Sequence, residues 1–138
     1  MMHSNRGAAQ YRAVRSHGLV ADCSPTRLVQ IMFEHILTHL VTAQGCMGRI
    51  EKNNLPLREV TTKIVAVRKA LLLIGQLNAT LDMGRGAHIA QDLRALYEYM
   101  LVRLTLANAT IDARMVAEVA SLVRSIKTGW DGIVTDKR

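Results

Sequence analysis

The chain has 138 residues and a mass of 15.3 kDa, which is room for one domain with a single core and too little for two. Hydrophobic residues make up 49% of it, yet few are aromatic and only two residues are proline, a balance that favours leucine- and alanine-rich helices over β-sheets. The formal net charge of +7 raises nucleic acid as a partner. The basic residues, Lys63 among them, are spread over every predicted helix and form no run interleaved with aromatics, so we predict a solvated basic surface and no nucleic-acid binding.

Targeting signals and cysteines give an expectation about location. The longest apolar run, Ala70 to Ile74, is too short for a secretory signal or a membrane span. Cys23 and Cys46 are separated by most of one predicted helix, about 30 Å at the standard rise per residue, so they cannot bridge each other. Free thiols without an export signal favour a cytoplasmic protein.

Residues 1–23 predict a partly ordered N-terminal arm, because two glycines interrupt a sparse apolar set that includes Tyr11 and Val14. Ser24 is expected to cap the first helix with Pro25 at its first position, where the missing N–H costs nothing. This helix is predicted over residues 26–52, and Pro56 prevents its continuation. Its apolar stripe is wide, because Phe33 and Leu37 lie beside the residues that recur at helical spacing.

The second helix is predicted over residues 57–83, with Leu73 and Leu77 again widening its apolar stripe. The third, over residues 87–108, carries two apolar stripes. The spacing predicts that the first faces the core; it comprises Ile89, Leu93, Leu96, Tyr97, Met100 and Leu104. The second comprises Tyr99, Val102 and Leu106, and indicates either an enclosed helix or a surface kept for another protein.

Asp112 is expected to cap a fourth helix over residues 113–129, with Trp130 as a lid on the end of the domain. Helices about 27 to 42 Å long joined by short loops predict an all-α fold, an antiparallel up-down four-helix bundle. We therefore divide the chain into an arm (1–23), the bundle (24–130) and a C-terminal tail (131–138).

The sequence offers little that could perform catalysis. His35, His39 and Cys46 would share one side of the first helix, but ligands from elsewhere that would close a metal site are not evident. Gly84-Arg85-Gly86 lacks the strand and the GK[ST] motif of a phosphate loop, and the serines lack a nucleophile elbow. We predict no enzyme activity, no metal and no cofactor.

Several segments, in this order and at these separations, resemble the family of flagellin-specific export chaperones (FliS). The resemblance runs from about Gln10 to Ile133. It is carried by AQYRAV (9–14), SPTRLVQIMFE (24–34), LDMGRG (81–86), IAQDLRALYEYM (89–100), RLTLAN (103–108) and GWDGI (129–133). The chain departs from the usual family pattern at His35-Ile36, at Ala87-His88 and at Gly129.

The resemblance implies a cytoplasmic chaperone that binds the disordered C-terminal segment of flagellin, stops it polymerising early, and aids its delivery to a component of the flagellar export gate. The alternative is a helical adaptor or obligate homodimer without chaperone activity. From periodicity we expect the partner-binding surface to comprise Phe33, Leu37, Leu73, Leu77, Leu81, Tyr99, Val102 and Leu106, with Tyr11 and Val14 as a displaceable arm.

Overall fold

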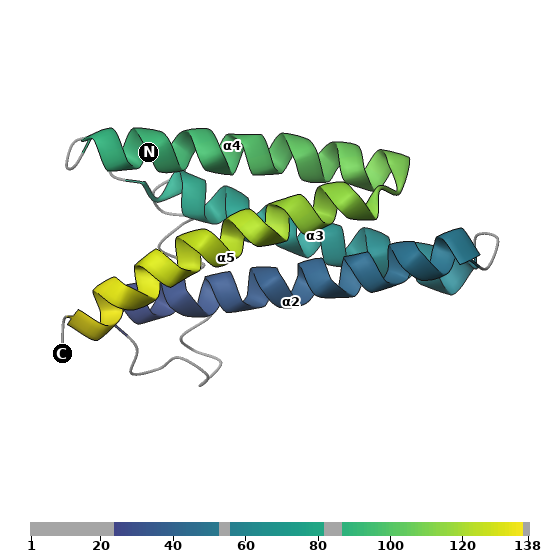
Figure 1. Cartoon of the computed structure of the whole chain (residues 1–138), viewed down its shortest axis with the longest axis horizontal. Coiled ribbons are helices and arrows are strands. Elements are labelled where there is room, and N and C mark those ends of the chain that lie inside the picture. The colour runs from purple at the N-terminus through teal and green to yellow at the C-terminus, as the bar shows by residue number, and fades with distance from the viewer. Residues whose placement is uncertain (1–23, 53–55, 82–86, 137–138) are drawn as a thin grey trace.

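A computed structural model describes residues 24–52, 56–81 and 87–136. The described residues form four α-helices and no strand: α2 (Pro25–Lys52), α3 (Leu57–Ala79), α4 (Ala87–Thr110) and α5 (Ala113–Asp136). Successive helices run antiparallel along one long axis, as Figure 1 shows. The predicted all-α, up-down four-helix bundle is confirmed.

The two predicted N-caps are formed. At the start of α2 the Arg27 backbone N–H donates to Ser24 Oγ at 3.2 Å, and Pro25 occupies the first helical position. At the start of α5 the backbone N–H groups of Arg114 and Met115 donate to Asp112 Oδ1 at 2.9 and 3.2 Å. Each cap satisfies N–H groups that a helix N-terminus leaves unpaired, which fixes where the helix begins.

The turn between α4 and α5 is tight and strained. Ile111 has φ of 54°, a left-handed conformation that costs an L-residue about 1–2 kcal/mol. It allows the Asp112 N–H to donate to the Ala107 carbonyl at 3.0 Å, which closes the C-terminus of α4. The turn therefore sends α5 back along α4 within two residues.

The helices are not equally enclosed. α2 packs against α3 on one side and α5 on the other, and α4 completes the bundle by packing against α3 and α5. Figure 1 shows α4 at one edge of the bundle, with α2 at the opposite edge. The most deeply buried large side chains come from all four helices: Phe33, Ile36, Leu40, Met47, Val67, Ile74, Met100, Leu104, Val116, Val119 and Val123.

Trp130 covers one end of the bundle, as the sequence predicts. Its Nε1 donates to the Thr26 carbonyl at 2.8 Å, and its ring meets that of Phe33 edge-on, with centroids 6.3 Å apart. Asp131, the next residue, accepts hydrogen bonds from Gln30 on α2 and Lys127 on α5. These contacts tie the last part of α5 to the first turns of α2.

Two predicted helix ends are wrong. α5 does not stop at Gly129 but continues to Asp136, so a tail beginning at residue 131 is not observed. The contacts of Trp130 and Asp131 with α2 favour continued helix there. Conversely, α3 ends at Ala79 rather than near Met83. The Thr80 backbone N–H, just after this end, donates a hydrogen bond to the Gln76 carbonyl at 3.1 Å.

Candidate functional site: apolar surfaces on α4 and α3

The outer side of α4 carries three large apolar residues that remain exposed. Tyr99 is 42% exposed, Val102 67% and Leu106 43%. Spacings of three and four residues place them in one line along the helix, which we call the α4 stripe. The opposite side of α4 supplies Tyr97, Met100, Leu104 and Ala107 to the core. The prediction of two stripes on this helix is confirmed for these residues.

Tyr99 is held in place at the border between α4 and α5. Its hydroxyl donates to Glu118 Oε2 at 2.6 Å, while Arg103 Nε donates to the other carboxylate oxygen at 2.9 Å. The Arg103 guanidinium also lies 5.9 Å from the centre of the Tyr99 ring, within cation–π distance. The hydrogen bond from Tyr99, with that from Arg103, holds the pKa of Glu118 below its usual value. These contacts orient the tyrosine ring at one end of the stripe.

The structure corrects part of the predicted binding surface. Phe33 and Leu77 are buried in the core, so their placement on an accessible surface is wrong: the neighbouring helices cover the part of the α2 and α3 stripes on which these two residues lie. Leu37, Leu73 and Leu81 are half-buried and pack against the core. Tyr11 and Val14 lie outside the described residues. Of the eight helix residues predicted, only the three of the α4 stripe are exposed.

Sequence periodicity also misassigned or missed exposed apolar residues. Ile89 was expected to face the core, but it is largely exposed near the start of α4. The other large apolar residues with high exposure are Val41, Leu57, Val65 and Leu72. These residues and the α4 stripe lie on α2, α3 and α4. Among the α5 residues whose exposure is described, none is a large exposed apolar residue. The uncovered apolar residues are therefore distributed over three helices and are not confined to the α4 stripe.

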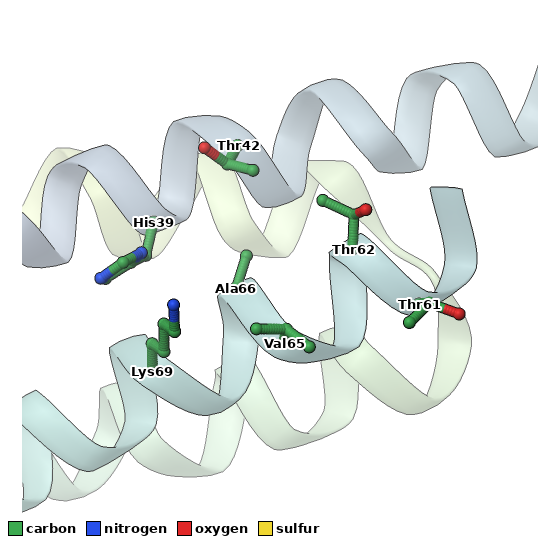
Figure 2. Close-up of a pocket in the computed structure, with 7 residues that line it drawn as sticks. All are labelled: His39, Thr42, Thr61, Thr62, Val65, Ala66 and Lys69. Atoms are coloured by element: carbon green, nitrogen blue, oxygen red, sulfur yellow. The ribbon is translucent and has the colours of Figure 1, made fainter. Parts of the chain in front are cut away.

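A shallow hollow of about 270 Å³ lies between α2 and α3 (Figure 2). It is lined by His39, Thr42, Thr61, Thr62, Val65, Ala66 and Lys69. Figure 2 shows the His39 and Lys69 side chains reaching toward each other across one end of it. Burial, followed by the charge of Lys69, lowers the pKa of His39, so the imidazole is neutral at neutral pH.

The chain matches the family described as "Flagellar protein FliS" over residues 7–137. It belongs to the FliS family. A relative named flagellar secretion chaperone FliSB, from Pseudomonas aeruginosa, is 36% identical over 132 residues, covering 96% of this chain and 98% of the relative. Relatives named flagellar secretion chaperone FliS are 32% identical in Salmonella typhimurium (96% and 93% covered) and 31% in Vibrio cholerae (93% and 89% covered).

The FliS family is one of chaperones and not of enzymes, as the sequence predicts. Within the described part of this FliS chain, no three His, Cys, Asp or Glu side chains come together to hold a metal ion. Cys46, one candidate ligand, is fully buried with a free thiol whose pKa is raised by that burial. Nor does any described helix combine the length and apolarity needed to cross a membrane.

Lys63 is not part of a solvated basic surface, contrary to the expectation from sequence. It lies on the inner side of α3 with only 4% of its surface exposed. Its Nζ donates to the backbone carbonyl and to the side-chain Oδ1 of Asn108, at 3.0 and 2.8 Å. This carbonyl is in the last turn of α4, where helix carbonyls lack intrahelical partners. Lys63 therefore joins α3 to the C-terminal end of α4.

Burial of Lys63 predicts a particular dependence of stability on pH. Desolvation lowers the pKa of Lys63 in the folded protein below its usual value of 10.5. Between the lowered pKa and 10.5 the unfolded chain binds more protons at this site than the folded one, so its contribution to the unfolding free energy rises with pH. Lys63→Met should remove that rise, whereas Lys69→Met, at an exposed lysine of the same helix, should retain it. Urea unfolding of the three proteins across this pH range measures the effect, and parallel pH profiles for all three would contradict it.

Proposed function

We propose that this FliS family member is a cytoplasmic flagellar secretion chaperone. In this proposal it binds the disordered C-terminal segment of flagellin, prevents premature polymerisation, and aids transfer to the flagellar export gate. Support comes from its relatives, which are named as flagellar secretion chaperones, and from the α4 stripe. The stripe is the observation on which the proposal depends most, because a binding protein for an unfolded segment must expose apolar surface.

The physical reason is the cost of ordering a disordered client. Fixing each residue costs about 1–2 kcal/mol of conformational entropy. Apolar burial returns about 25 cal/mol per Å², so the client must cover a broad apolar surface. Tyr99, Val102 and Leu106 offer part of such a surface along about two turns of α4, in the pattern that receives or extends a helical segment. Tyr99 contributes an aromatic anchor already ordered by Glu118.

Replacing Val102 by aspartate tests this proposal. A charge in the centre of the stripe should weaken binding of a flagellin C-terminal segment at least about tenfold, because apolar burial there would be replaced by desolvation of a carboxylate. Folding should be nearly unchanged, since Val102 is exposed. Isothermal titration with the purified segment measures the affinity, and circular dichroism measures any helix that the segment gains on binding.

Val41→Asp is the matched control, because Val41 is similarly exposed but lies on α2, at the opposite edge of the bundle. It should bind the segment as the unmodified chain does. Equal loss in both variants, or full binding by Val102→Asp, would argue against the α4 stripe. Sedimentation of the protein with and without the flagellin segment tests the alternative function. A stable symmetric dimer that the segment does not dissociate would favour an obligate homodimer.

A further inference from the structure

The positive charge of the helices is concentrated on α3. This helix has four basic residues, Arg58, Lys63, Arg68 and Lys69, against one acid, Glu59. In α4 and in α5 the acids and bases are equal in number. Glu59 is occupied by Arg49 of α2 at 3.0 Å, and no ion pair among the described residues engages Arg68 or Lys69. Both cations are exposed and available to an external acid.

Arg68 and Lys69 border an apolar patch on the same side of α3. Val65 is 42% exposed and Leu72 59% exposed. The spacing of Val65, Arg68, Lys69 and Leu72 is i, i+3, i+4, i+7, which makes them neighbours on one helix surface. We call these four residues the α3 face. It presents two large apolar side chains flanked by two free cations.

The hollow between α2 and α3 adds a concave feature to this surface. Val65 and Lys69 belong both to the α3 face and to the wall of the hollow (Figure 2). Threonine and alanine side chains give most of the remaining wall, and His39 and Lys69 provide polar groups at one end. At about 270 Å³ the hollow can receive an apolar side chain, and a carboxylate beside that side chain would be within reach of Lys69.

We propose that the α3 face is a second docking surface, separate from the α4 stripe, and that its occupant is an acidic amphipathic helix of a partner protein. One apolar side chain of that helix fills the hollow beside Val65, and another, about two turns along, covers Leu72. Its flanking carboxylates pair with Arg68 and Lys69. An acidic helix should prefer the α3 face to the α4 stripe, because α3 has an excess of basic residues and α4 has no excess of either charge.

The central apolar residues favour a protein helix over nucleic acid. A nucleic-acid surface places cations along a phosphate path and stacks bases on aromatic rings. The α3 face instead has Val65 and Leu72 exposed between its cations, and α3 contains no aromatic residue. The proposal does not depend on flagellin binding, since it involves none of the residues of the α4 stripe.

The test uses the full-length protein and a fluorescein-labelled synthetic helix of about 16 residues, roughly four turns. The probe carries leucines at i, i+3, i+4 and i+7 and glutamates on both borders of that stripe. Fluorescence anisotropy should show saturable binding, and a probe with glutamine in place of every glutamate should bind about tenfold more weakly. Added salt should reduce, but not abolish, binding of the glutamate probe. Equal binding of the two probes, or no binding of either, would overturn the proposal.

Protein variants then locate the binding. Lys69→Glu should weaken the glutamate probe about tenfold, and Val65→Ser should also weaken it without changing the helix content. Arg124→Glu makes the same change in net charge at an exposed position of α5 and should leave the affinity within about twofold. Val102→Asp should also leave it unchanged. The proposal fails if Arg124→Glu or Val102→Asp weakens binding as much as Lys69→Glu does, or if an oligonucleotide of about 20 nucleotides displaces the probe.

Discussion

Replacing Leu77 by aspartate should unfold the protein. Leu77 is buried in the core of the bundle, where truncating a leucine to alanine alone costs about 2–5 kcal/mol. Aspartate adds a carboxylate inside this apolar core, and burying an unpaired charge costs several kcal/mol more. Their combined cost reaches the total stability of an ordinary domain, about 5–15 kcal/mol. Circular dichroism should show lost helix or a melting transition lowered by tens of degrees.

Leu72→Asp is the control for this substitution. Leu72 lies on the same helix, but it is exposed, so only the lower helix propensity of aspartate should matter, at most about 1 kcal/mol. Its melting transition should stay within a few degrees of that of the unmodified chain. If instead Leu77→Asp melts normally and loses only partner binding, Leu77 is a surface residue and its original assignment from periodicity is restored.

Leu77 also shows what sequence periodicity could and could not determine. The spacing of apolar residues predicted wide apolar stripes on α2, α3 and α4, and the helix lengths with short loops predicted four antiparallel helices. Periodicity does not reveal which part of a wide apolar stripe the neighbouring helices cover. Each helix packs against two others, and these contacts bury Phe33 and Leu77 but leave the α4 stripe exposed. Val102 lies opposite the core-facing side of α4, so its exposure could be predicted.

Some helix boundaries are set by local hydrogen bonds, which the sequence predicts, and others by contacts between distant residues, which it does not. Ser24 and Asp112 cap helices through hydrogen bonds to residues two or three positions away, and the sequence alone predicts such contacts. The sequence predicted that the fourth helix ends at Gly129, but α5 continues past it, where Trp130 contacts α2. Lys63 was misjudged for the same reason: its partner Asn108 is 45 residues away in the chain. No local pattern signals either contact.

The α4 stripe and the α3 face share a helical spacing of apolar residues but differ in the charged residues beside them. Both present apolar residues three, four or seven positions apart. On α4 the adjacent arginine is already paired, because Arg103 donates to Glu118. On α3 the adjacent Arg68 and Lys69 have no ion-pair partner among the described residues. The charge pattern, rather than apolar spacing, thus separates a surface suited to a neutral segment from one suited to an acidic helix.

Replacing Trp130 by alanine should destabilise the bundle by about 3 kcal/mol, toward the lower end of the range for removing a large aromatic side chain, because Trp130 is half-buried. The loss includes the edge-on contact with Phe33 and the hydrogen bond to the Thr26 carbonyl, two of the contacts that join α5 to the first turns of α2. Amide hydrogen exchange should show faster exchange at both of these helix ends than in the centre of the bundle. Urea unfolding measures the loss of stability.

Trp130→Phe separates the two contacts. Phenylalanine retains an aromatic ring against Phe33 but has no N–H to donate to Thr26, so it should cost only about 1 kcal/mol, the net value of one hydrogen bond. The Thr26 carbonyl lies within α2 and keeps its place in the helix ladder, which limits the penalty. If Trp130→Phe costs as much as Trp130→Ala, the hydrogen bond rather than the ring holds the end of the bundle. If neither variant changes stability, the last part of α5 contributes nothing to closing the bundle, and the continuation of the helix past Gly129 has another cause.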